Sequence, residues 1–123
     1  MTKLTEGQHN SEFLIAEANG HISREAVTIA SGEELEPGHV LGRVSDSDEY
    51  KVYNPSNDDG SEEAVAVCCG HVDASDESVS GVPIIARHAE VNAEELVWFD
   101  DATDDEKKTG ISELAEKSGI IAR

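Results

Sequence analysis

The chain has 123 residues and a mass of 13.2 kDa, a size that allows one small domain with a modest core. It carries 27 Asp and Glu residues against 9 Lys and Arg residues, for a formal net charge of −18. A field of this sign repels nucleic acid and argues against direct DNA or RNA binding. No run of about 18 apolar residues occurs, so the sequence excludes a membrane-spanning helix.

The acidity has two interpretations. One is an ordinary acidic surface that keeps the protein soluble by repulsion. The other is adaptation to concentrated salt, where screening within a Debye length of about 3 Å at 1 M removes the repulsion between carboxylates. Acidic residues fall in nearly every predicted loop, and this spread favours salt adaptation.

Residues 1–12 are polar and show no hydrophobic period, so we interpret them as a flexible arm that orders only on binding. A frayed terminus without a role is the alternative. Phe13-Leu14-Ile15 is a short apolar patch that is either a first strand or an anchor for the arm. We expect residues 13–123 to form one domain.

The stretch from Ser23 to Val44 predicts two short strands joined by a turn-rich link. Val27 and Ile29 alternate with a polar residue, as a half-buried strand requires. Pro37-Gly38 supplies a tight turn, because proline fixes φ and glycine accepts a positive φ without a clash. After this turn the chain returns to an apolar layer through Val40, Leu41 and Val44.

Three more segments have strand patterns. Glu49–Tyr53 alternates in polarity and is expected to form a hairpin with the strand that starts at Val40. Ala64–Val72 is a continuous apolar run, short and rich in valine, which predicts a fully buried strand. Val82–Val91 is the last clear strand, with its proline near the start, where the missing N–H donor is tolerated.

Two helices are predicted after these strands. Asn92 is suited to cap a short helical turn that runs through Leu96. Thr103 and Glu106 match a capping box at the start of a C-terminal helix, and Gly119 suits its left-handed end. The predicted fold class is mostly β (α+β): a small antiparallel sheet or barrel with a short helix, a C-terminal helix and a flexible N-terminal arm.

The chemistry-bearing residues do not form a catalytic or metal-binding pattern. Cys68 and Cys69 are adjacent, so in a strand their thiols point to opposite faces, and we interpret them as structural. The histidines are scattered without a ligand spacing, and an imitation of a calcium loop at Asp46–Asn57 has the wrong residues at its fifth and twelfth positions. The sequence predicts no enzyme, no metal centre and no cofactor, while weak cation binding by acidic loops stays open.

Several segments resemble a known family. They are Glu17–Gly20, Ser23–Glu25, Val27–Gly32, Leu35–Gly42, Arg87–Trp98 and Gly119–Arg123. Their order is similar to that in the head decoration proteins of tailed viruses, the capsid-cementing family of the lambda decoration protein D type, and the resemblance covers about residues 12–123.

The resemblance implies a virion protein on the outer surface of the expanded head. It implies a homotrimer at three-fold and quasi-three-fold positions that clamps neighbouring major capsid proteins against the pressure of packaged DNA. It also implies that the arm orders on binding and adds a strand to a capsid-protein sheet. The expected capsid contacts are Thr2, Lys3, Leu4, Thr5, Phe13 and Leu14. The expected trimer contacts are Pro37, His88, Val97, Trp98 and Phe99.

Two other functions remain as alternatives. The first is a small β-barrel module on a virion that binds carbohydrate or a host surface, for which Tyr50, Tyr53 and Trp98 are the aromatic candidates. The second is a small hydrolase or lyase that uses carboxylates with His71 or His88, which would need a pocket of converging groups.

Overall fold

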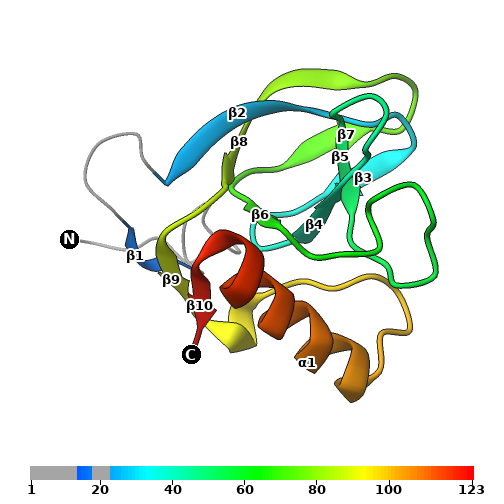
Figure 1. The fold of residues 1–123 in the computed structure, drawn as a ribbon. Coiled ribbons are helices and arrows are strands. Elements are labelled where there is room, and N and C mark those ends of the chain that lie inside the picture. Colours follow the sequence, from blue (N-terminus) through cyan, green and yellow to red (C-terminus); the bar gives the residue numbers. More distant parts are fainter. Residues whose placement is uncertain (1–13, 18–22) are drawn as a thin grey trace.

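The computed structural model describes residues 14–17 and 23–123, and its centre is a closed barrel with the strand order β2-β5-β4-β6-β8 (Figure 1). All neighbouring barrel strands are antiparallel except β2 and β5, which are parallel and meet at Ile29 and Tyr50. The mostly β fold with a helix near the C-terminus is confirmed. The barrel strands are β2 (Arg24–Ile29), β4 (Val40–Arg43), β5 (Tyr50–Val52), β6 (Ala66–Cys68) and β8 (Val79–Ile85).

Two smaller sheets flank the barrel. In one of them β9 (Ala89–Val91) lies between β1 (Leu14–Glu17), which is antiparallel to it, and β10 (Ile120–Ala122), which is parallel to it. In the other, β3 (Glu33–Leu35) pairs with β7 (Val72–Ala74). Segments from both ends of the chain therefore meet on β9.

Adjacent residues of the barrel strands divide into two cores. Leu41 and Ile84 belong to a cluster to which all the barrel strands contribute, and this cluster is therefore the barrel interior. Their chain neighbours Val40 and Ile85 belong to a second cluster, shared with β9, Leu114 and Ile120. Because successive side chains of a strand point to opposite faces, β4 and β8 are buried on both sides.

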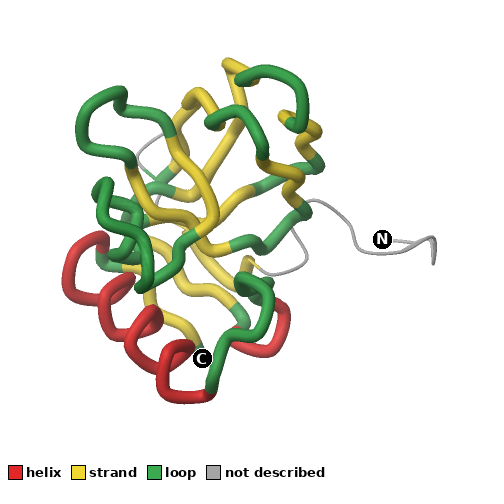
Figure 2. Tube along the Cα trace, turned by 90° about the vertical axis from the view of Figure 1, so that its right-hand side faces the viewer, coloured by secondary structure: helices red, strands yellow, loops and turns green. Residues whose placement is uncertain are grey.

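The helices lie together at one end of the molecule (Figure 2). The short 3₁₀ helix η1 (Ala93–Glu95) is capped by the Asn92 side chain, which accepts from the Glu94 N–H at 3.0 Å. The helix α1 (Asp104–Glu113) begins with the predicted capping box and continues as a π-helical turn, η2 (Leu114–Ser118), up to Gly119 at φ 66°. No helix in the described part of the chain has the length and apolar character needed to cross a membrane.

Three strand predictions need correction. Ala64–Val72 is not one strand, because β6 ends at Cys68 and β7 starts at Val72 in a different sheet. Val82–Val91 is likewise two strands, since the chain leaves the barrel at Ala86 and enters the β9 sheet after His88, at φ 52°. In addition β8 starts at Val79, so its proline lies inside the strand, exposed and opposite Ala26. The link before Pro37 contains the unpredicted strand β3.

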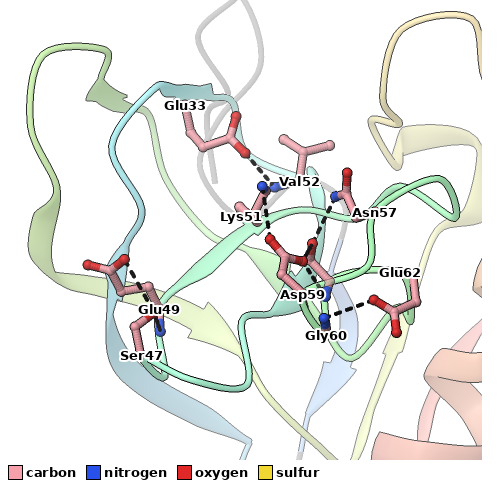
Figure 3. A network of polar contacts seen from close by, with 10 residues as sticks. Glu33, Ser47, Glu49, Lys51, Val52, Asn57, Asp59, Gly60 and Glu62 are labelled. Carbon is pink, nitrogen blue, oxygen red and sulfur yellow. Dashed lines mark hydrogen bonds and ion pairs between the residues drawn. The ribbon is translucent and has the colours of Figure 1, made fainter.

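The loop between β5 and β6 is held by a polar network (Figure 3). Asp59 accepts hydrogen bonds from the Ser61 N–H at 3.1 Å and hydroxyl at 2.5 Å, and it pairs with Lys51 at 3.2 Å. These contacts lower the pKa of Asp59 to about 2, and the hydrogen bonds from Ser61 have the largest effect. Ser61 is buried against Gly42, where a Cβ atom would lie 2.5 Å from the Ser61 backbone. The network therefore fixes this loop against β4.

We predict that Gly110→Ala destabilises the protein although alanine is the better helix former. A Cβ atom at this buried position of α1 would lie 2.6 Å from a Trp98 ring carbon and 3.1 Å from a Tyr53 ring carbon. Overpacking of this kind costs about 1–3 kcal/mol of unfolding free energy, measurable by denaturant unfolding. The control is Ser112→Ala, at an exposed position of the same helix. An unchanged or higher stability for Gly110→Ala would contradict the packing described here.

Candidate functional site

The predicted capsid-contacting arm leads directly into β1. Thr2, Lys3, Leu4, Thr5 and Phe13 lie outside the described residues, and Leu14 is the first residue of β1. In the described sheet β1 is an edge strand, because β9 pairs with it on one side only. Leu14 lies opposite Val91, and the register shifts by one residue before Ala16, as in a β-bulge. In the sequence, the predicted arm is thus joined to an edge strand of the described sheet.

The predicted trimer contacts Val97, Trp98 and Phe99 form a half-buried segment between η1 and α1. The Val97 N–H donates to the Gly38 carbonyl at 2.9 Å, and the Val97 carbonyl accepts from the Val40 N–H at 3.0 Å. The rings of Trp98 and Phe99 meet the fully buried Tyr53 ring edge-on, at centroid distances of 6.0 and 5.9 Å. This segment is therefore anchored on its inner side and exposed on its outer side.

The other two predicted contacts lie in different environments. Pro37 is fully buried within the protomer, so it shapes the turn beside Val97 but presents no surface to a partner. His88 is exposed between β8 and β9, where its N–H donates to the Ser118 carbonyl and its ring lies next to Gly119. The structure thus brings Val97, Trp98 and Phe99 together and places His88 elsewhere.

An open groove runs beside this half-buried segment. It consists of two adjoining hollows of about 620 and 440 Å³. The apolar part of the lining comes from Leu35, Val52, Val72, Val97, Trp98 and Phe99. The charged part comes from Glu33, Glu34, Glu36, Asp73 and Asp100, together with Lys51, which pairs with Asp59 outside this set. Both hollows share four residues: Glu34, His39, Trp98 and Asp100. We call this feature the acidic groove.

His39 lies at the centre of the acidic groove and is held in its neutral form. The Glu36 N–H donates to its Nδ1 at 3.0 Å, so a neutral ring carries its proton on Nε2. Burial lowers the pKa of His39 below its ordinary value of 6.5, against the opposing effect of Glu36, Glu33 and Asp100. The groove therefore has a neutral donor among its carboxylates.

Sequence reasoning missed the acidic groove. Glu34 and Asp73 are direct cross-strand partners in the β3–β7 pair, and His39 forms a β-bridge with Val97, whereas the sequence predicts a turn-rich link at Glu34 and no strand at Asp73. The local signal for β3 is weak, because Glu33-Glu34-Leu35 has one apolar residue and high charge. No local pattern indicates that Trp98 and Asp100 lie beside this pair.

The buried thiols do not add a reactive centre. Cys68 faces the barrel interior and Cys69 faces the second core, as predicted for adjacent strand residues. Burial raises the pKa of Cys68, which disfavours the reactive thiolate. Within residues 14–17 and 23–123 no three His, Cys, Asp or Glu side chains lie close enough to hold a metal ion. The acidic groove, with its open form and mixed polar and apolar lining, is suited to binding a surface.

Comparison with known proteins identifies the family. The family model described as Bacteriophage lambda head decoration protein D matches residues 3–120. The chain belongs to this head decoration family. A search of curated proteins finds no match. As a head decoration protein the chain is a structural component of a virion, bound to the outer surface of the head. The resemblance inferred from the sequence motifs is thereby confirmed.

We predict that His39 makes stability depend on pH. Because its pKa is lower in the folded protein than in the unfolded chain, its contribution is complete above about pH 6.5 and is lost as the pH falls through the folded value. Denaturant unfolding of the wild type and of His39→Gln at about pH 7.5 and pH 5.5 measures this contribution. The wild type should lose more stability than the variant. Equal losses would show that His39 is not held neutral by the fold.

Proposed function

We propose that this protein binds the outside of the expanded capsid as a homotrimer at three-fold and quasi-three-fold positions, where it cements major capsid proteins against DNA pressure. Membership of the head decoration family carries the proposal. Many copies, each bound at several points, stabilise a shell through avidity even when each single contact is weak. We propose no catalytic role and no cofactor.

The placement of β1 supports a capsid-binding role for the segment from Thr2 to Leu14. β1 pairs with β9 on one side, and within the described sheet its other edge has no partner strand. A strand edge without a partner can accept a strand from a neighbouring sheet, and a segment joined to it can donate one. A capsid protein that pairs there would be joined to β9 and through it to the second core.

The segment from Val97 to Phe99 is our proposed trimer contact. Its side chains are half-buried in the protomer, and their inner faces are fixed by Tyr53 and by the bonds to Gly38 and Val40. Aromatic side chains that are anchored in this way lose little conformational freedom when a partner covers them. Pro37 supports this segment from within the protomer.

We further propose that the protein is adapted to concentrated salt. A trimer would carry three times the net charge of −18, and this charge opposes association at low ionic strength. The ion pairs of Arg43 with Asp48 and of Arg123 with Glu90 are largely exposed, so they offset little of this repulsion. Screening by molar salt would remove most of it.

Co-sedimentation with expanded, undecorated capsids tests this function. We expect saturable binding, stronger in molar salt than in low salt, with a copy number that matches the three-fold positions. Deletion of residues 1–12 should weaken binding at least about tenfold, as expected for the loss of a multipoint contact. The matched control replaces residues 1–12 with a Gly/Ser segment of equal length.

The outcomes separate the alternatives. Binding to a few sites only would favour a displayed module that binds a host surface. Full binding by the Gly/Ser variant would show that the side chains of residues 1–12 do not contribute to the capsid contact. No binding in any salt would contradict the decoration function for this chain.

A further inference from the structure

The acidic groove contains like charges that are brought together by strand pairing. Glu34 in β3 lies directly opposite Asp73 in β7, and both side chains are exposed, while Leu35 and Val72 face the barrel core. Like charges that are directly opposite destabilise an antiparallel pair. Neither carboxylate forms an ion pair with another described residue, although Asp73 accepts hydrogen bonds from Ser75. This pairing favours a cationic occupant.

Asp100 and Trp98 add to this preference for a cation. Asp100 lines both hollows together with Glu34, and it too forms no ion pair with the rest of the described chain. The half-buried Trp98 lines both hollows with them, and an aromatic face attracts an ammonium group that approaches it. Carboxylates and an indole in one groove suit the long side chain of a lysine, whose methylene stem is apolar and whose end is charged.

The described chain has two lysines suited to this role. Most other basic side chains pair with carboxylates of their own protomer, as Lys51 does with Asp59 and Lys117 with Glu63. Lys107 and Lys108, on consecutive positions of α1, form no ion pair within the described residues. They are the complement, in charge, of the acidic groove.

The acidic groove and Lys107 meet along one segment. Residues 97–100 line the acidic groove, and residues 96–102 line a third hollow together with Lys107. In Figure 1 this segment, drawn in yellow to gold, runs between the barrel and α1. Two complementary patches of one protomer give a head-to-tail contact between copies. Such contacts close into a ring of three when each copy is rotated by a third of a turn from the one before it.

We propose that in the trimer the acidic groove of each copy receives Lys107 and Lys108 of the next copy. This inference rests on the proposed trimer and assigns its two complementary faces. Trp98, Glu34 and Asp100, which line both hollows of the groove, would contact the incoming lysines. At molar salt only charges at contact distance still interact, because the Debye length is about 3 Å. The contact therefore remains effective where long-range repulsion between copies is screened.

Charge reversal tests this contact. The groove variant is Glu34→Lys with Asp100→Lys, the helix variant is Lys107→Glu with Lys108→Glu, and the combined variant carries all these changes. We expect each double variant to lower the association constant of the trimer by about tenfold or more, since close charge pairs contribute at this level across an interface. The combined variant should recover most of this loss because it restores complementarity with the same net charge as the wild type.

Two controls accompany the charge reversal. Asp46→Lys with Glu116→Lys makes the same change in net charge as the groove variant, but at exposed positions outside the groove. We expect this control not to weaken the trimer. If added acidic residues unfold α1, as circular dichroism would show, Lys107→Gln with Lys108→Gln replaces the helix variant. Association is measured by analytical ultracentrifugation at about 2 M salt and at the lowest salt in which each variant is folded.

Cross-linking on decorated capsids tests the same contact if the trimer forms only on the shell. A carbodiimide joins carboxylates to lysines in direct contact, and a mixture of isotopically labelled and unlabelled copies identifies links between copies. We expect links from Lys107 or Lys108 of one copy to Glu34, Asp73 or Asp100 of another. The assigned contact is wrong if trimers form but charge reversal does not weaken them, or if the combined variant does not recover the association constant. It is also wrong if these cross-links are absent. In each case the proposed trimer itself is not contradicted. If no trimer forms in solution or on capsids, the trimer itself is contradicted.

Discussion

The structure depends on barrel strands that are buried on both faces. Adjacent residues of β4, β6 and β8 pack into opposite cores, as Leu41 and Val40 do, one inside the barrel and one beneath the β9 sheet and the helical end. A shift of register by one residue would exchange the two sets and bring residues of the wrong size into both cores. This constraint fixes the barrel, and it also fixes the surfaces that β9, η1 and α1 present.

Local signals in the sequence were sufficient for much of the fold. The capping box at Thr103 and Glu106 and the left-handed Gly119 depend on residues only a few positions apart, and the structure contains both. The apolar run from Ala64 to Val72 could not be divided from sequence, because it contains no charged residue on either side of Gly70. Only the three-dimensional path shows that the first belongs to the barrel and the second pairs with β3.

The surface features were harder to predict for the same reason. Val97, Trp98 and Phe99 were expected as trimer contacts from the family resemblance, whereas the groove beside them joins β3, β7 and Asp100, which are distant in sequence. Charge composition indicated an acidic surface but not where unpaired carboxylates gather. A decoration protein needs broad contact surfaces rather than an enclosed pocket. Here the β1 edge, the exposed aromatic segment and the acidic groove are the surfaces that the fold provides.

The central claim is that this head decoration protein strengthens the shell. The most direct measurement is the temperature at which DNA-filled heads release their DNA, with and without saturating amounts of the protein, in molar salt. The account predicts that decorated heads retain DNA to a clearly higher temperature, and that the increase follows occupancy of the three-fold positions. Release at the same temperature with all sites occupied would contradict a cementing role. The protein would then bind the outer surface of the head without stabilising it.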